Sequence, residues 1–130
     1  MITGVGVDIV EIRRIEAAVE RYGERFLRRI FTETERAYCE RFGPQRWLHY
    51  AARFAAKEAF SKAIGTGMRH PCRWRDIGVV NGASGKPELQ LFGELAQRYA
   101  GYSFHLSLSH TATHAVAVVV AEVGHESRRL

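Results

Sequence analysis

The sequence is poor in cysteine, proline and lysine, and it lacks any long run of apolar residues. Its only cysteines, Cys39 and Cys72, form neither a CxxC pair nor a recognisable disulfide framework, which favours a reducing compartment such as the cytoplasm. No apolar stretch is long enough to cross a bilayer, and the first residues lack the basic region of a signal peptide. Of 19 basic residues only Lys57, Lys62 and Lys86 are lysines, so we expect a compact ammonium to be needed at these positions.

Several common catalytic motifs are missing as well. Gly85-Lys86 does not belong to a P-loop, because Val80 stands where the first glycine is needed and Pro87 replaces the Ser or Thr. The glycines near the start lack the third glycine of a dinucleotide fingerprint. Ser109 and His110 are adjacent, so in an extended segment they point to opposite faces and do not form a nucleophile–base pair.

The composition is that of one folded domain. In a chain of 130 residues, 46% are hydrophobic and 25% are charged, which supports a core and argues against disorder. We expect a single domain over residues 1–130, with a frayed tail from about residue 124. The net charge of +5 suggests an anionic partner.

Hydrophobic periodicity predicts an α+β fold with an antiparallel sheet and helices on one side of it. The pattern predicts strands over 2–9, 77–80, 88–91, 104–109 and 115–121, and helices over 11–22, 26–30, 32–43, 45–64 and 93–100. The third helix opens on a capping box from Thr32 to Glu35. The longest helix carries a stripe of mostly small side chains, so another element should pack closely against it. This stripe consists of Leu48, Ala52, Ala55, Ala59 and Ala63.

Polar residues gather in segments whose order along the chain is informative. These segments are Gly4-Val5-Gly6-Val7-Asp8-Ile9-Val10-Glu11-Ile12, Arg53-Phe54-Ala55-Ala56-Lys57-Glu58-Ala59-Phe60-Ser61-Lys62-Ala63, Gly85-Lys86-Pro87 and Ser107-Leu108-Ser109-His110-Thr111. In this order they resemble the holo-acyl-carrier-protein synthase family of phosphopantetheinyl transferases, and the resemblance spans nearly the whole chain.

The resemblance implies a fold, a reaction and its partners. The fold would be that of a 4′-phosphopantetheinyl transferase, active as a homotrimer in the cytoplasm. The reaction would move 4′-phosphopantetheine from coenzyme A to a serine of apo-acyl carrier protein, releasing 3′,5′-ADP, in fatty acid biosynthesis. Mg²⁺ would be required, and neither nucleic acid nor a membrane would be a partner.

Asp8 and Glu58 each allow a structural and a functional interpretation. Asp8 could cap the following helix with Glu11, and Glu58 could form an i,i+4 surface pair with Lys62. By resemblance both are instead Mg²⁺ ligands, which suits a metal that binds one or two carboxylates together with substrate phosphates. We expect Glu58 and Lys62 to be the catalytic residues, with Glu58 as the general base.

The remaining motif residues are expected to bind coenzyme A. Arg53 and Lys57 lie four positions apart and could form a solvated basic face, but coenzyme A offers three phosphate groups for cations. We therefore assign Arg53, Lys57 and Lys62 to phosphates collectively. By resemblance Gly85, Lys86 and Pro87 contact the coenzyme, although they could simply form a turn, and Ser109 and His110 line its pocket.

A separate basic surface is predicted on the first helix. Arg14 and Arg21 lie seven positions apart and share one face, away from the apolar stripe. A solvated helix face usually mixes charges of both signs, and an acyl carrier protein is strongly acidic. We expect Arg14 and Arg21 to contact the carrier.

Two other functions would explain part of the sequence. A nucleic-acid-binding module would account for the arginines, but Asp8 and Glu58 would repel phosphates unless a metal intervened, and no aromatic residues interleave the basic patch. A carrier-binding protein without activity would not need these two carboxylates.

Overall fold

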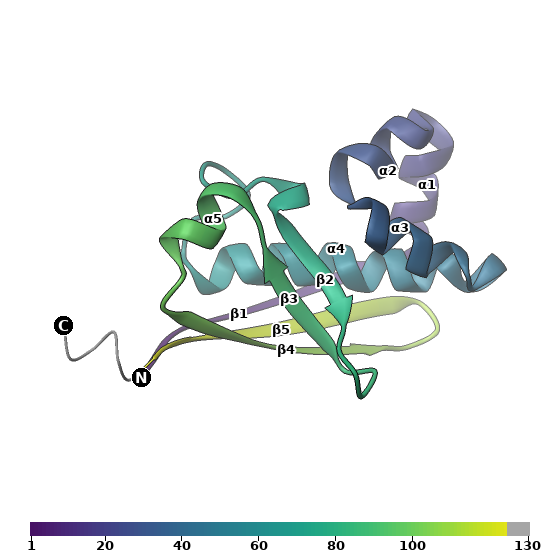
Figure 1. Ribbon diagram of the computed structural model, residues 1–130. Coiled ribbons are helices and arrows are strands. Elements are labelled where there is room, and N and C mark those ends of the chain that lie inside the picture. Colours follow the sequence, from purple (N-terminus) through teal and green to yellow (C-terminus); the bar gives the residue numbers. More distant parts are fainter. Residues whose placement is uncertain (125–130) are drawn as a thin grey trace.

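A computed structural model describes residues 1–124, with the strands running beside one long helix (Figure 1). The predicted fraying of the tail falls on residues 125–130, which lie outside the described part. The strands are β1 (Ile2–Glu11), β2 (Ile77–Asn81), β3 (Pro87–Leu91), β4 (Tyr102–His110) and β5 (His114–Val123). The helices are α1 (Ile12–Tyr22), α2 (Glu24–Ile30), α3 (Glu33–Glu40), α4 (Arg46–Ala63) and α5 (Gly93–Arg98), with short 3-10 turns η1 (Gly43–Gln45) and η2 (Trp74–Asp76).

The strands form two antiparallel sheets rather than the single one predicted. The larger sheet has the order β1-β5-β4, so the first strand of the chain pairs with the last one, Val7 lying opposite Val118. Strands β2 and β3 form a separate two-stranded hairpin. The predicted α+β class and antiparallel pairing are confirmed.

Helix α4 covers the inner face of the larger sheet, and its alanine stripe lies directly on β1. Gly4 and Gly6 make this contact possible: a Cβ on Gly6 would lie 1.9 Å from the carbonyl oxygen of Ala59, and one on Gly4 would lie 2.0 Å from that of Ala63. The element that packs closely on the stripe is therefore a strand of the same chain.

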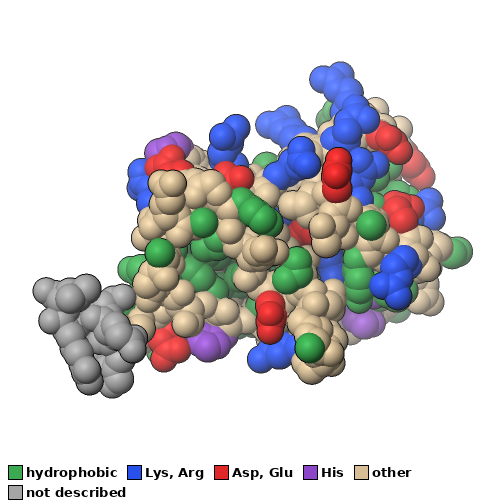
Figure 2. Space-filling view, in the orientation of Figure 1, with side chains coloured by type: hydrophobic (Ala, Val, Ile, Leu, Met, Phe, Trp, Pro, Cys, Tyr) green, Lys and Arg blue, Asp and Glu red, His purple; other side chains and the backbone are tan. Residues whose placement is uncertain are grey.

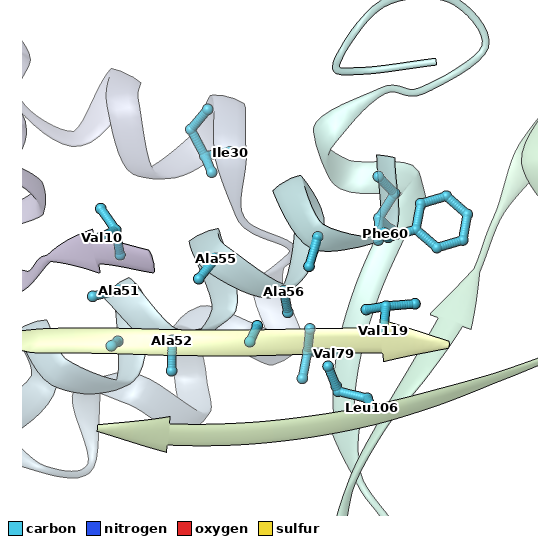
Figure 3. Close-up of a cluster of buried hydrophobic side chains, with 14 of the residues drawn as sticks. Val10, Ile30, Ala51, Ala52, Ala55, Ala56, Phe60, Val79, Leu106 and Val119 are labelled. Atoms are coloured by element: carbon cyan, nitrogen blue, oxygen red, sulfur yellow. The ribbon is translucent and has the colours of Figure 1, made fainter. Parts of the chain in front are cut away.

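Small side chains of α4 and branched residues of the sheets build the core between them (Figure 3). Ala55 and Ala56 are completely buried, as is Val119 on β5, while Val79 brings the β2–β3 hairpin into the same core. Helices α1, α2 and α3 gather at one end of α4, and α5 lies towards the other (Figure 1). The capping box is confirmed, since Thr32 Oγ1 accepts from Glu35 N at 3.1 Å and Thr32 N donates to Glu35 Oε1 at 2.8 Å.

None of the helices within residues 1–124 covers the outer face of the larger sheet. Val5, Val7 and Ile9 of β1 are 62%, 53% and 64% exposed, although they form the more apolar face of that strand. Val118 and Val120 of β5 continue the same face and are half-buried. None of the described helices is both long and apolar enough to span a membrane.

Candidate functional site

Asp8 and Glu58 meet where β1 crosses α4. Asp8 shares the inward face of β1 with Gly4 and Gly6, and its side chain is 18% exposed. Lys62, one turn beyond Glu58, donates from Nζ to Asp8 Oδ1 at 3.1 Å and to the carbonyl of Val7 at 3.0 Å. The structure thus brings both predicted metal ligands and the predicted catalytic lysine into one cluster.

The cluster has a distinct electrostatic character. Burial raises the pKa of Glu58 above its usual value, the negative charge of Asp8 raises it further, and Lys62 lowers it. Asp8 does not cap α1, because β1 continues to Glu11 and no side chain bonds to the free N–H groups of that helix end. The alternative interpretation of Asp8 as a helix cap is therefore wrong, and within residues 1–124 its carboxylate pairs with Lys62 alone.

A small cavity of ≈ 250 Å³ collects predicted coenzyme-binding residues from distant segments. Its lining includes Arg53 of α4, Gly85 of the hairpin loop, Pro87 at the start of β3, and Ser109 and His110 of β4. Lys86 lies on the same loop with its side chain exposed. The cavity thus unites three of the sequence segments that carried the resemblance.

Arg53 lines this cavity and is almost completely buried, at 3% exposure. Its Nη2 donates to Asn81 Oδ1 at 3.0 Å, and the guanidinium carbon lies 4.1 Å from the centroid of the Tyr38 ring. Its Nε finds no hydrogen-bond acceptor among residues 1–124. A buried donor without an acceptor is costly, so the positive charge of Arg53 favours an anionic ligand in the cavity that this residue lines.

Asn81 and His49 line the cavity although the sequence did not single them out. Asn81 bridges Arg53 to the hairpin loop, since its Nδ2 donates to the carbonyl of Gly85 at 2.9 Å. His49 stacks on Phe42 with ring centroids 3.7 Å apart. Asparagine in a turn and histidine on a helix are common, so only the tertiary contacts reveal these two residues.

Lys57 occupies a different environment from the one predicted for it. It is completely buried, and its Nζ donates to Glu35 Oε1 at 2.9 Å, to the carbonyl of Trp74 at 3.0 Å and to that of Ile77 at 2.6 Å. Glu35 Oε2 accepts from the amide of Val79 at 2.7 Å. All three ammonium protons thus have acceptors inside the protein, so the structure does not support the predicted phosphate contact of Lys57.

The predicted carrier surface is exposed. Arg14 and Arg21 both lie on the outside of α1, and neither forms an ion pair within the described chain. The guanidinium of Arg21 lies over the ring of Tyr22, 5.3 Å from its centroid. Gly23, with a φ of 71°, ends α1, so the basic residues that follow belong to the separate helix α2.

Comparisons with known proteins agree with this arrangement. Residues 4–119 match the model of the 4′-phosphopantetheinyl transferase superfamily. A holo-[acyl-carrier-protein] synthase of Solibacter usitatus is 50% identical over 126 residues, covering 94% of this chain and 99% of that protein.

Solved structures give the same result. A Bacillus anthracis holo-(acyl-carrier-protein) synthase in complex with CoA (3′,5′-ADP) is 41% identical, with a TM-score of 0.81 over 95% of this chain and 99% of that one. The synthase of Neisseria meningitidis is 37% identical, with a TM-score of 0.85 over 94% and 99% of the two chains. The chain therefore belongs to the 4′-phosphopantetheinyl transferase superfamily, within its group of holo-acyl-carrier-protein synthases.

Proposed function

We propose that this protein transfers 4′-phosphopantetheine from coenzyme A to a serine of apo-acyl carrier protein, releasing 3′,5′-ADP, in fatty acid biosynthesis. One observation carries the proposal: Arg53, a buried arginine whose Nε has no acceptor within residues 1–124, lines the same cavity as Gly85, Pro87, Ser109 and His110. Relatives named holo-[acyl-carrier-protein] synthase, one of them solved in complex with CoA (3′,5′-ADP), support it.

The donor set fits Mg²⁺ completed by substrate. Among residues 1–124 no group of three or more His, Cys, Asp and Glu is placed to hold a metal ion. Asp8 and Glu58 nevertheless lie close enough for one carboxylate to raise the pKa of the other. Mg²⁺ usually takes one or two carboxylates and fills its remaining positions with water and substrate phosphates. When bound, the ion would neutralise charge on the diphosphate.

The side chains of the protein bind and orient the reactants. Lys62 is half exposed beside Asp8, so its side chain is free to move and its ammonium can contact a phosphate bound at the cluster. Arg53 supplies a donor for a second phosphate group. The carrier provides the attacking serine, which explains why this chain needs no activated nucleophile. Glu58 is our candidate for the base that accepts the serine proton, because its raised pKa lies nearer to neutral pH than that of an ordinary glutamate.

The carrier is expected to dock on α1. Arg14 and Arg21 present two exposed guanidinium groups without carboxylate partners in the described chain. An acidic carrier would be attracted and oriented by them. Reversing both charges should raise the KM for the carrier and leave the KM for coenzyme A unchanged. An unchanged carrier KM and salt dependence would refute this docking site.

We also propose that the protein assembles as a homotrimer in the cytoplasm. The uncovered apolar face of β1 and β5, with Val5, Val7 and Ile9 more than half exposed, supports self-association. Sedimentation velocity would give the stoichiometry, and Val7→Glu should shift the protein towards monomers. A monomeric wild-type protein at micromolar concentration would contradict the assembly.

Intact-mass spectrometry of an apo carrier incubated with the protein, coenzyme A and Mg²⁺ tests the reaction. A phosphopantetheine-sized gain is expected, and a chelator should abolish it. Asp8→Asn and Glu58→Gln should suppress the gain and raise the Mg²⁺ concentration needed for half-maximal rate. Glu94→Gln, an exposed carboxylate on α5, is the matched control. No gain with the unaltered, folded protein and several carriers would refute the proposed function.

A further inference from the structure

A basic groove runs from the end of α1 across α2 to α5. It consists of two adjoining hollows of ≈ 670 Å³ and ≈ 780 Å³, which share Arg29 and Trp74. The first hollow is bordered by Tyr22 and Arg25, and the second by Arg73 and Arg75. Figure 2 shows basic side chains gathered over this part of the surface.

Most arginines of the groove have no carboxylate partner within residues 1–124, although Asp76 also lines the second hollow. Arg25, Arg29, Arg73 and Arg75 are exposed, and none of them has an ion pair with a carboxylate of residues 1–124. Arg28, which also lines the first hollow, differs because it pairs with Glu24 at 3.6 Å. Unpaired guanidinium groups that line the same hollow repel one another, so binding an anionic partner would relieve this repulsion.

Aromatic side chains lie among the arginines that line the groove. Trp74 is half-buried and stacks on Phe54, with ring centroids 5.0 Å apart, so its position is fixed from below. Phe92 at the far end and Tyr22 at the near end are 39% and 57% exposed. A groove lined by both arginines and aromatic side chains suits a partner with carboxylates beside apolar side chains, which is the pattern of an acidic amphipathic helix.

The groove is continuous with the predicted docking surface of α1. Arg21 lies over Tyr22, and Tyr22 borders the first hollow. We propose that the acyl carrier protein also occupies this groove, with Arg73 and Arg75 contacting its carboxylates and Trp74 its apolar side chains. This inference rests on the proposed function, and it adds three contacting residues from a segment far from α1 in the sequence.

Kinetics with a charge-reversed variant test the groove. Arg73→Glu/Arg75→Glu should raise the KM for the carrier about tenfold at low salt and flatten its salt dependence, because two attractive contacts become repulsive. The KM for coenzyme A and the kcat should stay the same. Arg41→Glu/Arg69→Glu is the matched control, since both residues are exposed, border neither hollow and change the net charge equally. Circular dichroism and thermal melting would show that both variants fold.

Each outcome decides between the possibilities. A higher carrier KM in the groove variant alone would support the proposal. An equal rise of the carrier KM in both variants would show that net charge steers the carrier without a contact in the groove. An unchanged carrier KM in both variants would mean that the carrier docks on α1 alone. Either result overturns the proposal. The proposal would also be overturned, in favour of a nucleic acid, by a different pair of results. A single-stranded oligonucleotide would inhibit the unaltered protein but not the groove variant, and the groove variant would have an unchanged KM for the carrier. If the unaltered protein fails to modify any carrier, the proposed function and this inference both fall.

Discussion

Replacing Lys57 by methionine tests whether this lysine stabilises the fold or binds phosphate. Lys57 and Glu35 are both completely buried, so the substitution leaves the Glu35 carboxylate without a counter-charge in the core. Removing one partner of a buried ion pair costs about 3–5 kcal/mol, and the carbonyls of Trp74 and Ile77 also lose their donor. We expect the free energy of unfolding to fall by about 4 kcal/mol, within the same range.

Urea unfolding at a fixed protein concentration measures this loss, since assembly makes the apparent stability depend on concentration. Lys62→Met is the control: it removes the same group from the same helix, but the Lys62 side chain is 51% exposed and its pair with Asp8 is open to solvent. The control should lose less than about 1 kcal/mol. Adding Glu35→Gln to Lys57→Met should restore part of the stability, because it removes the buried charge.

Two results would refute this reasoning. A Lys57→Met protein as stable as the Lys62→Met protein would mean that the pair contributes little to the fold. A stable Lys57→Met protein with a much higher KM for coenzyme A would restore the phosphate contact that the sequence predicts for this lysine.

Three further changes have definite expected outcomes. Gly6→Ala should cost about 3 kcal/mol in urea unfolding, because the new methyl group would lie 1.9 Å from the carbonyl oxygen of Ala59; an unchanged midpoint would contradict the close strand–helix contact. Burial, with the charges of Arg53 and His110, lowers the pKa of His49 below 6.5, so the unfolded chain binds this proton more readily and stability is lost as the pH falls from 6.5 through the folded pKa. His49→Phe should make the unfolding midpoint less dependent on pH over that interval, and an identical dependence would reject the assignment. Burial raises the pKa of Cys39 to about 12, so this thiol should resist Ellman's reagent at pH 8 in the native protein and react after unfolding in urea; rapid native reaction would show that it is accessible.

The sequence predicts the elements of this fold better than their arrangement. Regular periodicity predicts α4 almost to its ends, and the capping box predicts where α3 begins. The alternation in β1 defines two faces, but it does not reveal which one is buried. The more apolar face, with Val5 and Val7, is exposed, because the alanines of α4 can approach the strand closely only over glycines.

For the candidate site too, the sequence predicts residues from local motifs but not the contacts between distant segments. Asp8, Glu58 and Lys62 were predicted from motifs, and the structure brings them together. The environment of Lys57 depends on Glu35, which lies 22 positions away, and local spacing gives no sign of such a pairing. Asn81 likewise becomes recognisable only through its bond to Arg53, 28 positions away.

The contact between β1 and α4 has a consequence for how this protein can evolve. No side chain lies between Gly6 and the backbone of α4. A substitution at this contact therefore cannot be accommodated by a change of rotamer on either element. In a library that randomises β1 and is selected for activity, positions 4 and 6 should return glycine almost without exception. Such invariance would resemble that of a catalytic residue, yet its origin would be the distance between two backbones. A position can thus tolerate no substitution although its residue never contacts a substrate.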